Sequence, residues 1–65
     1  MDFEVRRESI IFMVYPRSVA AKEWVGENVQ LEGWQWLGGG FSVDQHYIDN
    51  LLTGISEAGL SVGGN

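Results

Sequence analysis

The only histidine of the chain, His46, is the residue best suited to metal binding or acid–base chemistry near neutral pH. Asp49 follows it by three positions and Asn50 by four, and this spacing places the three side chains on one face of a helix. A metal site needs ligands that converge from several directions, which one short helical segment does not provide. We therefore interpret His46 as an exposed residue near a helix start, and we expect no metal.

Serine, histidine and aspartate are also present in the combination that a hydrolase triad requires. The candidates are Ser9 or Ser42 as nucleophile, His46 as base, and Asp44 or Asp49 as the orienting carboxylate. No nucleophile elbow or oxyanion motif accompanies them, and a small core leaves little room for a concave pocket. The sequence therefore predicts no catalytic residue and no cofactor, and we expect a non-enzymatic function.

A cluster of three glycines, Gly38 to Gly40, precedes a predicted helix by a few residues. Such a segment can form a backbone nest for an anion. It lacks the lysine of a P-loop, it does not match the dinucleotide fingerprint, and Asp44 stands where the anion would bind. Because glycine reaches the positive φ of tight turns, we favour a hairpin turn here.

Three aromatic residues, Trp34, Trp36 and Phe41, flank these glycines. They either fill a core beneath helices or form a stacking platform on a sheet. Proteins that bind single-stranded nucleic acid combine such a platform with a basic groove, and no lysine or arginine follows Lys22. We expect at least one tryptophan in the core, and we expect any exposed aromatic surface to bind protein.

The charge distribution bears on a nucleic-acid partner. The net charge is −5, and all four cations lie in the first third of the chain, at Arg6, Arg7, Arg17 and Lys22. Acidic residues over the remainder repel phosphate and disfavour nucleic acid as a partner. The alternative function is a nucleic-acid-associated regulator that uses these cations as a local basic patch, and it requires all four on one surface.

Length and composition indicate one small globular domain over residues 1–65. The chain has 45% hydrophobic and 20% charged residues, and a domain of this size buries only roughly 60% of the surface of its unfolded chain. Cysteine is absent, so neither disulfides nor thiolate zinc supplements the core. The apolar run over residues 10–15 is too short for a signal peptide or a membrane helix. We expect a cytoplasmic protein without membrane contact.

Hydrophobic periodicity divides the first two thirds of the chain into strands and one helix. The predicted elements are a weak strand over residues 3–5, a central strand over 9–15, a helix over 19–28 capped by Ser18, and a hairpin of strands 34–37 and 41–43. The strand over 9–15 is apolar at both odd and even positions. We therefore expect it to be covered on both faces.

Residues 44–59 have the clearest helical pattern. Asp44 is the expected cap, and the apolar stripe consists of Tyr47, Ile48, Leu51, Leu52 and Ile55. Gly59 ends the helix, and Leu60 is placed for the hydrophobic contact of a Schellman motif. A last short strand is predicted over residues 60–62.

This order of elements predicts an α+β fold, a small ferredoxin-like, split βαβ sandwich with the order β-α-β-β-α-β. A helix between two strands is a crossover, so the strands that each helix joins are expected to be parallel. We expect a mixed sheet with both helices on one face, and fraying over residues 1–8 and 63–65.

The two-faced strand gives the strongest indication of function. If two helices cover one sheet face, the other face exposes either Ile10, Phe12 and Val14 or Ile11, Met13 and Tyr15. Self-association or a protein partner would cover it. The alternative is that residues 3–5 or the C-terminal tail fold over it. The predicted partner-binding residues are Ile11, Met13, Tyr15, Trp34, Trp36 and Phe41.

Two sequence blocks carry a family resemblance. These are Trp-Gln-Trp-Leu-Gly-Gly at residues 34–39 and Val-Asp-Gln-His-Tyr-Ile at residues 43–48, followed by Gly59 and Leu60. They resemble short uncharacterised bacterial proteins, several of them encoded near phage or other mobile elements, over most of the chain from residue 16 onward. The resemblance implies a bacterial, cytoplasmic protein. It transfers no functional residue, because that family has no assigned activity.

Overall fold

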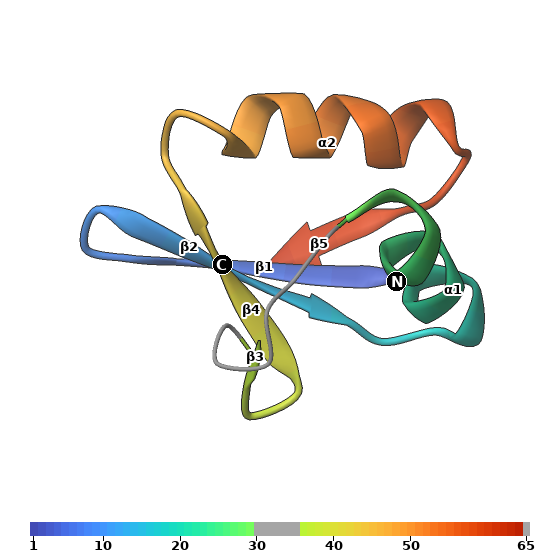
Figure 1. The fold of residues 1–65 in the computed structure, drawn as a ribbon, viewed down its shortest axis with the longest axis horizontal. Coiled ribbons are helices and arrows are strands. Elements are labelled where there is room, and N and C mark those ends of the chain that lie inside the picture. Colours follow the sequence, from blue (N-terminus) through green and yellow to red (C-terminus); the bar gives the residue numbers. More distant parts are fainter. Residues whose placement is uncertain (30–35, 65) are drawn as a thin grey trace.

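The computed structural model describes residues 1–29 and 36–64 and has an α+β fold with one mixed sheet and two helices (Figure 1). The elements in chain order are β1 (Phe3–Glu8), β2 (Ile11–Pro16), α1 (Val19–Asn28), β3 (Trp36–Leu37), β4 (Gly40–Asp44), α2 (Ile48–Glu57) and β5 (Val62–Gly64). Both helices pack on one face of the sheet, as predicted.

The five strands of the sheet have the order β3-β4-β2-β1-β5. Neighbours are antiparallel except for β1 and β5, which run parallel. Helix α1 joins β2 to β3 across β4, and α2 joins β4 to β5 across β2 and β1, so each helix connects parallel strands that are not adjacent. The predicted split βαβ arrangement is confirmed. β1 is an extra strand relative to that arrangement. It lies between β2 and β5, which correspond to the first and last strands of the ferredoxin-like order.

Residues 3–8 and 63–64, for which fraying was predicted, lie in strands of the sheet. β1 is a six-residue strand that pairs with β2 along its whole length, from Phe3 opposite Pro16 to Glu8 opposite Ile11. On its other side, Phe3 lies opposite Val62 of β5. The partner on that side is far away in sequence, so local periodicity gives no sign of the pairing. The last strand accordingly covers Val62–Gly64 rather than residues 60–62.

Helix α1 confirms its predicted bounds and cap. Ser18 has an extended backbone, and its Oγ accepts a hydrogen bond from the Ala21 amide at 3.0 Å. This bond satisfies one of the amides that have no partner within the helix. At the other end, Nδ2 of Asn28 donates to the carbonyl of Trp24 at 3.0 Å, which satisfies a carbonyl of the last turn.

Helix α2 begins at Ile48, so the predicted start at Asp44 was wrong. Asp44 is the last residue of β4, and its Oδ1 accepts the His46 amide at 2.7 Å while its carbonyl accepts the Tyr47 amide at 3.0 Å. These bonds close a turn between strand and helix, a common use of aspartate. Tyr47 occupies the cap position and makes no side-chain cap bond.

The C-terminal end of α2 forms the predicted Schellman motif. The Leu60 amide donates to the Ile55 carbonyl at 3.2 Å, and the Gly59 amide donates to the Ser56 carbonyl at 3.0 Å. Gly59 has a φ of 79°, a conformation that a side chain disfavours. Leu60 packs against the core, the hydrophobic contact that frequently accompanies this motif.

The glycine cluster forms the predicted hairpin turn between β3 and β4. Gly38 and Gly39 have φ values of 58° and 85°, and two successive positive values are the signature of a type I′ turn. The other hairpin, between β1 and β2, turns at Ser9 and Ile10 and has a positive φ of 62° at Ser9. It extends beyond the start of α2 (Figure 1).

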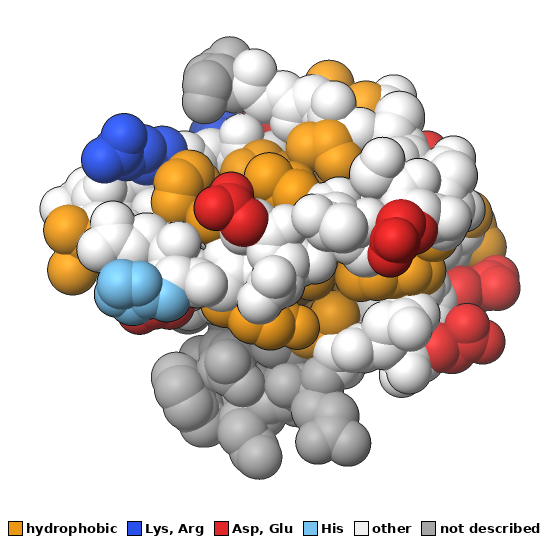
Figure 2. All heavy atoms as spheres, turned by 90° about the horizontal axis from the view of Figure 1, so that it is seen from above, with side chains coloured by type: hydrophobic (Ala, Val, Ile, Leu, Met, Phe, Trp, Pro, Cys, Tyr) orange, Lys and Arg blue, Asp and Glu red, His pale blue; other side chains and the backbone are white. Residues whose placement is uncertain are grey.

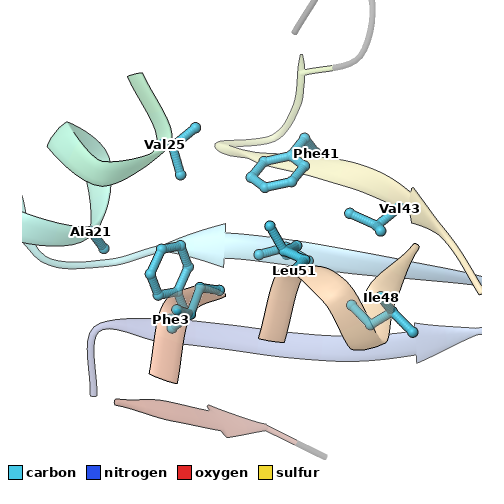
Figure 3. Packing of buried hydrophobic residues seen from close by; sticks show 9 residues of the cluster. Phe3, Ala21, Val25, Phe41, Val43, Ile48 and Leu51 are labelled. Carbon is cyan, nitrogen blue, oxygen red and sulfur yellow. The ribbon is translucent and has the colours of Figure 1, made fainter. Parts of the chain in front are cut away.

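The core lies between the helices and the sheet (Figure 3). Its buried residues are Phe3, Val14, Ala21, Val25, Phe41, Val43, Ile48, Leu51 and Ile55. In Figure 3, Phe3 and Phe41 point from the strands toward the helices. Most of the predicted stripe of α2 therefore faces the sheet. Tyr47 is the exception, because it precedes the helix and is 47% exposed.

Candidate functional site

The sheet face that carries no helix is the candidate functional surface, and we call it the open face. Residues directly opposite each other on neighbouring strands share a face, and successive residues alternate. Phe3, Val14 and Phe41 point to the helices, so the intervening residues point away. The open face consists of Glu4, Arg6 and Glu8 from β1, Ile11, Met13 and Tyr15 from β2, and Gly40, Ser42 and Asp44 from β4.

A charged cluster surrounds Tyr15 on the open face. The guanidinium groups of Arg17 and Arg6 lie 4.9 and 5.8 Å from the centre of the Tyr15 ring, within the range of cation–π attraction. Glu4 lies directly opposite Tyr15 on β1. The ring also covers Gly40, because a Cβ at that position would come within 2.5 Å of a ring carbon. Tyr15 is therefore held in one place from several sides.

Glu4 binds both arginines of this cluster. Its Oε1 accepts from Arg17 at 2.7 Å and its Oε2 accepts from Arg6 at 2.7 Å. The hydrogen bond from Arg17, followed by that from Arg6, holds the pKa of the Glu4 carboxyl below its usual value. The bond to Glu4 also raises the pKa of Arg6. The cluster carries two positive charges and one negative charge, and its geometry suits recognition of an acidic surface better than acid–base catalysis.

The register of β2 with its neighbours shows which side chains of this central strand point away from the helices. Ile11, Met13 and Tyr15 do so, whereas Phe12 and Val14 pack toward them. Ile11 is 37% exposed and Tyr15 is half-buried. Met13 is only 5% exposed and lies between Arg6 and Ser42, so its prediction as a contact residue was wrong. The apolar surface that a partner reaches is Ile11 and part of Tyr15.

The sequence also allowed residues 3–5 or the C-terminal tail to fold over this face. Among the described residues, neither segment does so. Both segments are strands of the sheet itself, β1 and β5. Met1 packs beside β5, since its Sδ lies 2.8 Å from the position that a Cβ of Gly63 would take. It is 70% exposed and adds an apolar side chain at the edge of the face.

The hairpin aromatics divide between core and surface. Phe41 is 1% exposed and belongs to the core, so its prediction as a partner-binding residue was wrong. Trp36 lies opposite Phe41, meets its ring edge to face at 5.5 Å, and remains 40% exposed. The predicted role of Trp34 falls outside the described residues. The sequence did not reveal which hairpin face meets the core, because that depends on the register with β2.

The four cations of the predicted basic patch do not share one surface. Arg6 and Arg17 lie together on the open face and both bind Glu4. Arg7 points to the other sheet face, because neighbouring residues of a strand alternate, and Lys22 lies on α1. On the face seen from above α2, acidic side chains are spread widely and Lys or Arg side chains are visible only toward the left (Figure 2). The condition that the nucleic-acid alternative requires is therefore not met.

The residues considered for catalysis or metal binding do not form a site in the part of the chain that the structure describes. Among residues 1–29 and 36–64, no group of three or more metal-binding side chains converges. Asp44 accepts the backbone amide of His46, which is exposed. This contact shapes the turn before α2.

The contacts of the Asp2 carboxylate with distant parts of the chain could not be foreseen from the sequence. Its carboxylate accepts the Ser18 hydroxyl at 2.6 Å and the Ser61 amide at 2.8 Å. The Ser18 bond, and next the Ser61 bond, lower the pKa of Asp2. Three segments that are distant in sequence thus meet at one carboxylate. A terminal aspartate carries no local signal of such contacts.

Comparison with protein-family models, with curated proteins and with solved structures finds no match to this chain. The family resemblance of residues 34–48 therefore stays a hypothesis. Neither α1 nor α2 is long and apolar enough to cross a membrane, and residues 1–29 and 36–64 contain no helix that is.

Proposed function

We propose that this chain is a non-enzymatic protein-binding module that binds through the open face. Trp36 is not part of this surface, because it pairs with the core residue Phe41 and lies on the helix side of the sheet. The observation that carries the proposal is the composition of β2. A two-layer domain with a solvated sheet face normally alternates apolar and polar residues, as β1 does with Glu4, Arg6 and Glu8. β2 instead has apolar side chains on both sides.

The chemistry of the open face supports a protein partner. Ile11 supplies an apolar contact, and Tyr15 presents a large ring whose conformation is restrained by Gly40 and the two arginines. Rigid aromatic side chains and arginine are the residues enriched in protein interfaces. We also propose a cytoplasmic protein of a bacterial or mobile-element system, which rests on the resemblance alone.

The experiment compares proteins that co-purify with tagged wild-type chain and with Ile11→Glu in the organism that encodes it. A charge at Ile11 lies on the contact surface and outside the core. We expect Ile11→Glu to lose the partner. Val19→Glu, at an apolar side chain that is 72% exposed on α1, is the matched control and should retain it. A set of partners that is the same with Ile11→Glu as with wild type would refute the proposal.

A further inference from the structure

Two arginines of the open face have hydrogen-bond donors that the described part of the chain does not use. A guanidinium group has five N–H donors. Arg6 donates from Nε to Glu4, and Arg17 donates from Nε and Nη2 to the same carboxylate. Among the described residues, the two guanidinium groups make no other hydrogen bond. The side chains of Arg6 and Arg17 are 50% and 48% exposed, so the remaining donors face solvent.

The two guanidinium groups are held ready for a second anion. Both bond to the Glu4 carboxylate, and both lie against the Tyr15 ring, at 5.8 Å from its centre for Arg6 and 4.9 Å for Arg17. Their positions are thus restrained before a ligand arrives, which lowers the entropic cost of binding. One carboxylate also leaves one of the two positive charges uncompensated.

Resting on the proposed function, we propose that the protein partner meets the open face with an aspartate or glutamate side chain, which accepts hydrogen bonds from Arg6 and Arg17. Arginine recognises carboxylates through paired N–H groups, and its charge is permanent. The bound carboxylate neutralises the cluster. Apolar atoms of the same partner then lie on Tyr15 and Ile11.

The surroundings favour a single carboxylate over a polyanion. Glu8 and Asp44 lie on either side of Ile11 on the same face, and the net charge of the chain is −5. A nucleic-acid strand carries a charge on every nucleotide and is repelled along most of such a surface. An isolated acidic side chain reaches the arginines without this repulsion, because about 13 Å of strand separates Tyr15 from Ile11.

An NMR titration with the capped tripeptide Ala-Glu-Ala tests the proposal, and the tripeptide Ala-Gln-Ala is the uncharged control. Because an exposed ion pair is weak, the titration extends to about 100 mM peptide, with the ionic strength held constant by sodium chloride. We expect saturable shifts of the Tyr15 ring signals and of the Nε–H signals of Arg6 and Arg17. Only the glutamate peptide should cause them.

Four variants locate the site. Arg6→Gln and Arg17→Gln should each weaken peptide binding at least about threefold, whereas Arg7→Gln, which removes a neighbouring cation on the other sheet face, should not. Glu4→Gln removes the competing negative charge and should strengthen peptide binding about threefold. All four side chains lie outside the core, and circular dichroism verifies that the variants fold.

Three results would overturn the inference: no saturable shift with the glutamate peptide, equal binding by Arg17→Gln and wild type, or weaker binding by Glu4→Gln. A short single-stranded DNA that shifts the same signals at lower concentration would also overturn it and assign the arginines to phosphate recognition. If the peptide does not bind but Ile11→Glu still loses its co-purifying protein, the protein-binding function stands and only the carboxylate recognition fails. If the peptide binds while Ile11→Glu keeps every partner, the carboxylate site stands and the proposed function fails.

Discussion

The Asp2 carboxylate accepts the hydroxyl of Ser18 at 2.6 Å, and the same hydroxyl oxygen accepts the Ala21 amide at 3.0 Å. The cap of α1 is therefore held by a residue at the start of the chain. Because Asp2 also accepts the Ser61 amide, the capped helix, β1 and the start of β5 are tied together.

The Asp2 contacts predict acid sensitivity. The pKa of Asp2 is lowered below 3.8 by the Ser18 bond and then the Ser61 bond, so its ionised form stabilises the folded chain. This stabilisation is present above the unfolded pKa and is lost as the pH falls through the folded pKa. We expect the urea midpoint of wild type to fall below about pH 4 and that of Asp2→Asn to fall less.

Glu4, whose pKa is also lowered, accounts for acid sensitivity that remains in Asp2→Asn. Glu4→Gln is therefore the companion variant. Curves of midpoint against pH that run parallel for wild type and Asp2→Asn would contradict the role of Asp2.

Removal of the cap should weaken α1. Ser18→Ala leaves the Ala21 amide without its acceptor, and loss of such a cap lowers the free energy of unfolding by about 1 kcal/mol. Ser18→Thr retains a hydroxyl and should lose much less. Urea unfolding followed by circular dichroism measures both variants, and equal stabilities of Ser18→Ala and wild type would contradict the cap.

Gly40 should not accept a side chain. A Cβ there would lie 2.5 Å from a Tyr15 ring carbon and 2.8 Å from the Val14 carbonyl oxygen. We expect Gly40→Ala to lower the free energy of unfolding by about 1–3 kcal/mol, a typical range for overpacking. Gly26→Ala is the control, because no atom stands near its Cβ and alanine favours helix by up to about 1 kcal/mol. A Gly40→Ala variant as stable as wild type would show that Tyr15 does not hold its place.

The Schellman end of α2 predicts a cost for replacing Gly59. Its φ of 79° has no obstruction around a Cβ, so the penalty comes from backbone conformation alone. Gly59→Ala should lower the free energy of unfolding by about 1–2 kcal/mol. Gly59→Asn should be milder, since asparagine tolerates this region. Thermal unfolding of the pair measures the difference, and an unchanged Gly59→Ala would refute it.

Signals confined to a few residues predicted the structure well. Ser18 marked a cap, the glycines at 38 and 39 marked a turn, and Gly59 marked a helix end, because each conformation depends on near neighbours. The predicted start of α2 at Asp44 was wrong, although aspartate is a good capping residue. Its carboxylate serves the His46 amide in a turn, and pairing with Ile11 holds it in β4.

Relations between distant segments could not be predicted in this way. The strand at residues 3–8 gains its second neighbour from Val62–Gly64, and the open face is defined only by the register that sets Met13 opposite Arg6 and Ser42. Likewise, the sequence could not show which side of the β3–β4 hairpin faces the core. The pairing of Phe41 with Val14 determines it. The candidate surface was predicted as two alternatives, and the fold selected one.

The position of β1 between β2 and β5 has a consequence for synthesis. A nascent chain emerges from its N-terminus, so β1 can pair with β2 early, but its outer edge waits for the last strand. Along that edge, beyond the residues that β5 reaches, lie Arg6, Arg7 and Glu8. Charged residues discourage an unpaired edge from joining a foreign strand. On the part of the β1 edge that β5 leaves unpaired, these charges therefore disfavour strand addition by another chain.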